Sequence, residues 1–206
     1  MQVVLATGNS GKVTEIREIV AAFGWQVVPQ TALGVLSAEE TGTTLAENAL
    51  IKARHAAQQT GLAAMADDSG LMVDALNGAP GVYSARFAGP SAGDEENNAK
   101  LLSVLATVDA PRSARYQCVM AFVEHANDLK PVLAYGSWEG FIATQPRGTG
   151  GFGYDPLFIV AADPEQRTAA ELLPAIKNRI SHRAQALVAL SEALQKRMTG
   201  FSAHDG

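Results

Sequence analysis

The order of the apolar segments along the chain is the feature that most constrains its fold. In the first part, short apolar runs that predict strands alternate with segments whose apolar residues recur at helical spacing. The predicted strands there are 1–6, 25–28 and 62–66, and the predicted helices are 12–23 and 43–59. Two longer apolar runs, 114–125 and 132–142, then follow one another and predict strands paired through a turn at 127–128. This order favours an α/β fold with a mixed, elongated, twisted sheet flanked by helices, and we expect two lobes with a cleft between them.

The remaining segments are compatible with one domain. A length of 206 residues predicts a single domain over 1–206. A helix is predicted over 94–107, a strand over 157–160 and a last helix over 181–198, whereas 78–89 is expected to be irregular. Residues 201–206 are expected to be a frayed tail.

Charge and hydropathy argue against two classes of partner. The formal net charge is −5 and Lys and Arg form no block, so we expect no nucleic-acid partner, although a small basic pocket for one phosphorylated ligand remains open. No apolar run approaches the roughly 20 residues that cross a bilayer, so we expect no membrane partner. The sequence begins with a predicted strand rather than a signal segment, which predicts a cytoplasmic protein. The single cysteine, Cys118, lies in an apolar run and is predicted to be a buried core residue.

Adjacent carboxylates follow the apolar run at 62–66. Asp67 and Asp68 come directly after it, and Ser69 and Gly70 come next. A buried strand that ends in this way delivers acids to an active-site edge, where they can hold a divalent cation and orient water. Asp, Ser and Gly are also the commonest turn formers, so the same residues are compatible with a plain turn.

A glycine-rich segment, Thr7-Gly8-Asn9-Ser10-Gly11-Lys12, joins the first predicted strand to the first predicted helix. Backbone N–H groups of such a turn, a helix N-terminus and a lysine ammonium together suit a phosphate. The spacing differs from that of a Walker loop, and a plain strand-to-helix connection would have a similar sequence.

Acidic residues lie around the start of the predicted helix 43–59. Glu40 and Glu47 would share one side of the helix if it extended back that far. Either could complete an oxygen-ligand magnesium site with Asp68, or both could complement the helix dipole on a solvated face. Lys52 is either a phosphate contact or, as the sequence alone favours, a solvated lysine.

A second glycine-rich loop, 148–153, has more backbone freedom than a hairpin needs. Phe152 and Tyr154 can offer an aromatic face to a nucleobase, and Asp155 can accept a hydrogen bond. The alternative is a structural loop in which the two rings anchor the core.

Cationic and polar residues precede the last predicted helix. Lys177 and Arg183 are cationic partners for a base carbonyl or a phosphate, and His182 can donate to a purine oxygen. Taken alone, Ser181 is a good N-cap, and His182 and Arg183 would form an exposed first turn.

These motifs occur together in one order. They are Thr7-Gly8-Asn9 with Lys12, Glu40 with Glu47-Asn48-Ala49, Ala66-Asp67-Asp68-Ser69-Gly70-Leu71, Gly78 to Arg86, Gly148 to Pro156, and Ser181-His182-Arg183. In this combination, from residue 1 to about 195, the chain closely resembles the inosine/xanthosine triphosphate pyrophosphatase family, which removes deaminated purine nucleotides, including dITP and XTP. Two departures are Ala184, where many relatives have Gly, and Pro174-Ala175-Ile176, which replace a charged approach to Lys177.

The resemblance implies hydrolysis of the triphosphate to a nucleoside monophosphate and pyrophosphate, with Mg²⁺, in a homodimer. It implies that Asp68 is the proton acceptor and that Glu40 and Asp68 hold the metal. It implies a substrate-binding set of Thr7, Gly8, Asn9, Ser10, Gly11, Lys12, Lys52, Ser69, Phe152, Gly153, Tyr154, Asp155, Lys177, His182 and Arg183. The predicted cleft would then hold the nucleotide.

Three other functions remain open on the sequence. A related pyrophosphatase would act on modified pyrimidine or methylated nucleotides, and a nucleotide-binding sensor would bind without turnover. A structural or interaction protein is the third, but it would leave the many polar residues at predicted turns unexplained. The presence of both Asp68 and Glu40 favours an enzyme over a sensor.

Overall fold

A computed structural model of the chain describes residues 2–8, 12–14, 16, 17 and 24–201. Three residues of the predicted phosphate loop, Asn9, Ser10 and Gly11, lie outside this part. Of the predicted helix 12–23, residues 12–14, 16 and 17 are helical and the others lie outside the described residues. No helix within the described part is long and apolar enough to span a membrane.

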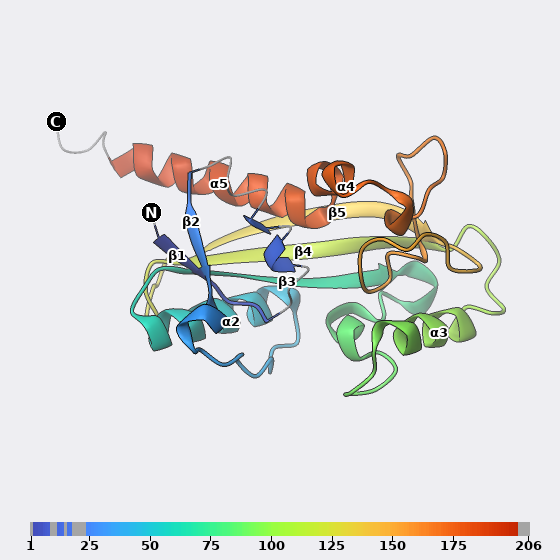
Figure 1. Cartoon of the computed structure of the whole chain (residues 1–206), viewed down its shortest axis with the longest axis horizontal. Helices are drawn as coiled ribbons and strands as arrows, with labels where there is room; N and C mark the ends of the chain where they lie inside the picture. Colours follow the sequence, from blue (N-terminus) through green and yellow to red (C-terminus); the bar gives the residue numbers. More distant parts are fainter. Residues whose placement is uncertain (1, 9–11, 15, 18–23, 202–206) are drawn as a thin grey trace. The chain divides into compact units, whose positions relative to one another are not determined.

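The strands form one mixed sheet, as the sequence predicts (Figure 1). Its order is β2 (Gln26–Pro29), β1 (Gln2–Leu5), β3 (Ala64–Val73), β4 (Ser113–Val123), β5 (Val132–Ile142) and β6 (Phe158–Val160). Strand β1 is parallel to both of its neighbours, whereas β5 and β6 are antiparallel. The parallel pairs come from the part of the chain where helices separate the strands, because a parallel pair needs a crossover connection.

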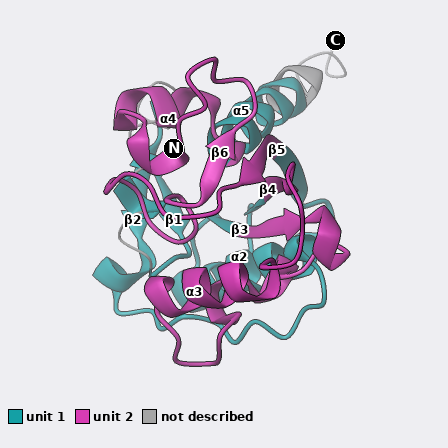
Figure 2. Ribbon diagram, turned by 90° about the vertical axis from the view of Figure 1, so that its right-hand side faces the viewer, with its two compact units in different colours: residues 1–68, 118–136, 183–206 teal, residues 69–117, 137–182 magenta. Residues whose placement is uncertain are grey.

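The chain divides into two compact units (Figure 2). Unit 1 comprises residues 1–68, 118–136 and 183–206, and unit 2 comprises residues 69–117 and 137–182. Each unit has its own hydrophobic core and is described by itself. The predicted cleft between two lobes stays a prediction.

Unit 1 packs helices α2 (Leu45–Thr60) and α5 (His182–Phe201) on opposite sides of its strands (Figure 1). Val3 and Leu5 of β1 share a core cluster with Leu187 and Leu190 of α5. The alanine-rich side of α2 is buried, as its periodicity predicts. Side chains of a strand alternate between the two faces of a sheet, so unit 1 places consecutive residues of one strand against different helices.

Unit 2 contains helix α3 (Asp94–Val104), the short helix α4 (Pro174–Ile180) and a 3-10 segment at Gly81–Arg86. Leu101 and Leu105 pack in the cluster that also contains Tyr116, Trp138 and Phe158. Helix α4 was not predicted. It is seven residues long and begins with Pro174 at its first turn, so it has too few turns to show a helical period.

Strand β3 is longer than the sequence predicts. The strand continues to Val73, so the two acids and Ser69-Gly70 lie within it, and the turn interpretation is wrong. The backbone N–H of Leu71 donates to Ser84 Oγ at 2.9 Å. A Cβ at Gly70 would lie 2.4 Å from the carbonyl oxygen of Gly81, so Gly70 allows a close approach of two backbones rather than a turn.

Candidate functional site

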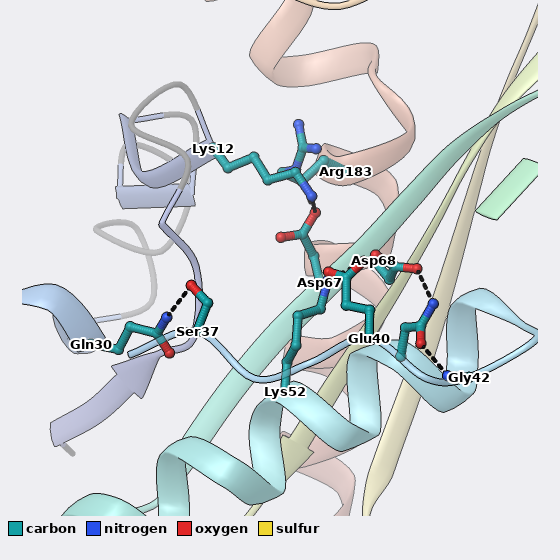
Figure 3. Close-up of polar contacts among 10 residues, drawn as sticks. Lys12, Gln30, Ser37, Glu40, Gly42, Lys52, Asp67, Asp68 and Arg183 are labelled. Carbon is teal, nitrogen blue, oxygen red and sulfur yellow. Dashed lines mark hydrogen bonds and ion pairs between the residues drawn. The ribbon is translucent and has the colours of Figure 1, made fainter. Parts of the chain in front are cut away.

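Two adjacent carboxylates of unit 1 face opposite sides of β3 (Figure 3). Asp67 contacts Lys12 and Arg183, whereas Asp68 contacts Lys52. This separation follows from the pleat, because successive side chains of a strand leave opposite faces. The two acids therefore have separate partners, and adjacency in sequence does not make them a shared chelating pair.

Lys52 joins Asp68 to Glu40. Its Nζ lies 2.8 Å from Asp68 Oδ1 and 2.8 Å from Glu40 Oε1. The lysine side chain is only 12% exposed, so the solvated interpretation of Lys52 is wrong. Glu40 lies in the segment before α2 rather than on the helix, and it reaches the site from there. Two carboxylates thus converge on one cation position.

Burial and charge shift the pKa values of this pair. Burial raises the pKa of Asp68, and the nearby Lys52 ammonium only partly offsets that shift. Burial alone would lower the pKa of Lys52, but Asp68, Asp67 and Glu40 together raise it. Lys52 therefore stays charged, while the Asp68 carboxylate is more basic than an ordinary aspartate.

Asp67 is fully buried and holds two cations. Its Oδ2 lies 2.9 Å from Lys12 Nζ and 3.2 Å from Arg183 Nε. Burial opposes its ionised form, but Lys12 and Arg183 outweigh this effect and hold the pKa of Asp67 far below its usual value. Arg183 is 1% exposed, so the prediction of an exposed first turn is wrong. Arg183, the second residue of α5, is a buried ion-pair partner of Asp67.

Unit 2 contains a second cluster, centred on the carboxylate of Asp155. Lys177 Nζ lies 2.7 Å from Asp155 Oδ2, and the backbone N–H of Phe152 donates to the same oxygen at 2.9 Å. The same ammonium lies 4.7 Å from the centre of the Phe152 ring, a cation–π distance. Gly151 has φ +74°, and a Cβ there would overlap the Asp155 carboxylate. The loop thus wraps around Asp155.

Aromatic rings stack next to this carboxylate in unit 2. His182 stacks on Tyr116 with ring centres 4.7 Å apart, and Trp138 is a further neighbour at 6.3 Å. His182 is buried and not part of an exposed turn. Tyr154 is buried, and its hydroxyl donates to the carbonyl of Ser84 at 2.8 Å. Of the two predicted alternatives, a stacking face for a nucleobase or an anchor in the core, Tyr154 therefore has the second. Phe152 is only partly buried. Of the two rings, it is therefore the one with exposed surface on which a nucleobase could stack.

Comparison with known proteins identifies the family. The profile of the Ham1 family matches residues 3–193. The chain belongs to the Ham1 family. A dITP/XTP pyrophosphatase from Thioalkalivibrio sulfidiphilus (strain HL-EbGR7) is 56% identical over 199 residues, which cover 96% of this chain and 100% of that relative. A dITP/XTP pyrophosphatase from Escherichia coli O157:H7 is 56% identical over 195 residues, or 94% of this chain and 98% of the relative.

Solved structures of Ham1 proteins have the same fold. A HAM1 protein from Coxiella burnetii is 53% identical and aligns with a TM-score of 0.87 over 95% of this chain and 99% of that one. A nucleoside-triphosphatase / dITP/XTP pyrophosphatase from Mycobacterium abscessus ATCC 19977 / DSM 44196 is 42% identical, with a TM-score of 0.72 over 92% and 97%. These agreements confirm the predicted fold class and family.

Other predicted residues of this Ham1 family member have less distinctive places. Thr7 is partly buried after β1, Gly8 is exposed, and Ser69 is partly buried in β3. Glu47 does not join the acid cluster. It forms a capping box with Thr44 at the start of α2, and the backbone N–H of Thr43 lowers its pKa, so the helix-terminus interpretation is confirmed.

One residue of this Ham1 site, Asn48, was not assigned a role from the sequence. Asn48 is fully buried one turn before Lys52 on α2; its Nδ2 lies 3.4 Å from Asp68 Oδ2. Its Oδ1 accepts from the backbone N–H of Gly42 at 2.8 Å. Both Asn48 and Lys52 thus connect Asp68 to the segment that carries Glu40. The one available signal is the i, i+4 spacing of two polar residues on an alanine-rich helix.

Proposed function

We propose that the protein hydrolyses inosine, deoxyinosine and xanthosine triphosphates to the nucleoside monophosphate and pyrophosphate. The observation that carries this proposal is the Asp68–Lys52–Glu40 arrangement, in which a buried carboxylate of raised pKa lies against a charged lysine and a second carboxylate. The activity named for relatives at 56% identity over nearly the whole chain supports it.

Asp68 is the proton acceptor of the proposed reaction. The oxygen of a water molecule forms a bond to phosphorus at the anhydride between the α- and β-phosphates, and the bond from that phosphorus to the bridging oxygen breaks. The Asp68 carboxylate takes the proton of this water, a role that fits a carboxylate held beside Lys52 and Glu40, where the phosphates are expected to bind. Lys52 and Lys12 offset the charge that develops on the phosphate oxygens.

Glu40 and Asp68 fit a magnesium ion. Both are oxygen donors, and each lies 2.8 Å from Lys52 Nζ, so this lysine brings the two carboxylates together and both could contribute to one magnesium site beside it. Within the described residues, no group of three acid, histidine or cysteine side chains could hold a metal alone. Mg²⁺ bound there would supply a Lewis acid at the phosphate oxygens.

The charge of the unit 1 cluster indicates when the metal would bind. The ion pairs join three carboxylates, Glu40, Asp67 and Asp68, to three cations, Lys12, Lys52 and Arg183. These charges balance without a metal. A triphosphate would add several negative charges, so Glu40 and Asp68 would hold Mg²⁺ together with the nucleotide rather than before it.

The Asp155 cluster of unit 2 is the proposed base-recognition group. The Phe152 ring offers a stacking surface, and Lys177 is a cation that could pair with the C6 carbonyl shared by hypoxanthine and xanthine. Adenine has an amino group at that position, which would meet a donor and remain unsatisfied. Guanine shares the C6 carbonyl, so its exclusion would require its 2-amino group to clash or to be buried unpaired. His182 and Arg183 stay predicted members of this set, although Arg183 is bound to Asp67 in this structure.

Pyrophosphate release tests the reaction. We expect Mg²⁺-dependent release of pyrophosphate from ITP and dITP, with little release from ATP or GTP and none after removal of the metal with EDTA. Equal release from all four nucleotides would overturn the proposed base recognition, whereas the proposed hydrolysis at the phosphates would still stand. Binding without release would indicate a nucleotide sensor instead.

A substitution at Gly42 tests the placement of Glu40. A Cβ there would lie 2.6 Å from Asn48 Oδ1 and 2.7 Å from Glu47 Cβ, so Gly42→Ala must displace the segment that carries Glu40. We expect kcat to fall about 10- to 100-fold and stability to fall by about 1–3 kcal/mol. Steady-state kinetics and urea unfolding measure the two effects. The exposed neighbour Thr41 provides a control, because Thr41→Ala should leave both near the wild-type values; a fully active Gly42→Ala protein would contradict the proposed placement.

Two further parts of the proposal rest on the family resemblance. We propose that the protein is a homodimer and that it acts in the cytoplasm, where the nucleotide pool is found. Sedimentation of the purified protein tests the first part, and fractionation of cells tests the second.

A further inference from the structure

Helix α3 binds both backbone polar groups of Gly153, the residue between Phe152 and Tyr154. The backbone N–H of Gly153 donates to Asp94 Oδ2 at 2.6 Å. Its carbonyl oxygen accepts from Asn98 Nδ2 at 2.8 Å. Neither Asp94 nor Asn98 belongs to the substrate-binding set that the resemblance implies, and both come from the first half of α3.

The position of Asn98 is closely defined. The residue is 9% exposed, and its Nδ2 also donates to the carbonyl of Asp94 at 2.8 Å. Both N–H bonds of the amide are therefore used, one on its own helix and one on the loop. Rotation of this side chain would leave the partly buried carbonyl of Gly153 without this donor, a loss that is unfavourable where water has limited access.

Gly153 determines how the two aromatic residues diverge. It has φ +63°, in the left-handed region, and this turn leaves Phe152 partly exposed while Tyr154 is buried. The N–H groups of Phe152 and Gly153 are both bound by carboxylates, of Asp155 and Asp94 respectively. The left-handed backbone of Gly153 thus directs the two aromatic side chains apart, and hydrogen bonds from α3 hold that backbone in place.

We propose that Asn98 and Asp94 are positioning residues for purine recognition, which fix the Phe152 ring by holding Gly153. This inference rests on the proposed function, in which the loop at 152–155 receives the base. The ligand class is the 6-oxopurine part of a nucleoside triphosphate. Asn98 and Asp94 act through the loop and not by contact with the phosphates, so they should affect substrate binding and base selection more than the chemical step.

The neighbouring residue Asn97 is a matched control. It has the same side chain, is 3% exposed and lies on the same helix. Its amide bonds a different segment, because Oδ1 accepts from Ala88 N at 2.8 Å and Nδ2 donates to Ala85 O at 3.2 Å. Asn97→Ala and Asn98→Ala therefore each remove a buried amide that makes two hydrogen bonds, but only the second releases Gly153.

The test measures kcat and KM for dITP, together with unfolding by urea. We expect Asn98→Ala to raise KM about tenfold, the effect of about one such hydrogen bond, with kcat within about threefold of wild type. Asn97→Ala should lose similar stability and keep KM within about twofold. Asp94→Asn keeps an acceptor oxygen for Gly153 N–H and should resemble wild type, whereas Asp94→Ala should resemble Asn98→Ala.

The outcomes separate this inference from the proposed function. Equal changes of KM in the Asn97 and Asn98 variants, or a loss confined to kcat, would overturn the positioning role. A wild-type KM in Asn98→Ala would do the same. Failure of the wild-type protein to release pyrophosphate from dITP in the same assay would overturn the proposed function itself.

Discussion

Asp68→Asn is expected to lower kcat for dITP about 1,000-fold, within the range of a lost general base. The amide keeps the shape of the carboxyl group but cannot accept the proton of the attacking water. Lys52 keeps Glu40 as its partner, so the fold of unit 1 should be retained. Single-turnover measurement of pyrophosphate release gives the rate of the chemical step directly.

Nucleotide binding provides the control for this variant. Calorimetric titration with a non-hydrolysable triphosphate should show retained binding, and thermal unfolding should show a folded protein. Near-wild-type turnover by Asp68→Asn would exclude Asp68 as the proton acceptor. Loss of both turnover and folding would instead indicate that Asp68 forms a structural ion pair, the role that we expect for Asp67.

Asp67→Asn is expected to destabilise the protein by about 3–5 kcal/mol, the cost of leaving buried charge without its partner. The side chain of Asp67 is fully buried, and that of Arg183 is 2% exposed. Lys12 also loses its carboxylate partner at 2.9 Å. Such a loss is a large part of the stability of a typical domain. Urea unfolding at neutral pH measures it.

The same variant changes how stability depends on pH. The pKa of Asp67 is far below its usual value in the folded protein, and about 3.9 is expected for an unfolded chain. Its contribution is therefore complete above about pH 4 and is lost as the pH falls further. We expect the unfolding free energy of the wild type to fall more steeply below pH 4 than that of Asp67→Asn.

A second substitution distinguishes a broken ion pair from a poor fit of the amide. Replacing Arg183 by Met in the Asp67→Asn background removes the buried charge that the first change leaves behind. Part of the lost stability should return, because apolar replacement of a buried pair is often neutral or favourable. No recovery in the double variant, together with an unchanged pH dependence, would contradict the role assigned to this ion pair.

Much of the fold is predictable because its signals are local. The apolar runs become β1, β4 and β5, and the alanine-rich helical period becomes α2 with its Thr44 cap. Strand β3 is the exception. Asp, Ser and Gly indicate a turn by local propensity, but Ser84 and Gly81, more than ten residues away in sequence, pack against this stretch and keep it extended.

The pairing of charged residues is less predictable because it depends on distant partners. The sequence around Lys52 is that of a solvated helix lysine. Its burial becomes evident only from its ion pairs with Asp68 and Glu40 in the folded chain. The same holds for Arg183, whose partner Asp67 is 116 residues away. The sequence supplies the residue types of the site, whereas tertiary contacts determine which of them meet.

The opposed directions of Asp67 and Asp68 limit how the chain can change in length. Insertion of one residue in β3 before Asp67 would move each of the two carboxylates to the opposite face, because the side-chain period of a strand is two. Every charge would remain, yet Asp67 would face Lys52, and Asp68 would leave that face and lie two residues beyond the position opposite Lys12 and Arg183. Insertions in the surface loops carry no such penalty. Length variation among relatives is therefore expected to be excluded from the first five residues of this strand, even where their composition varies.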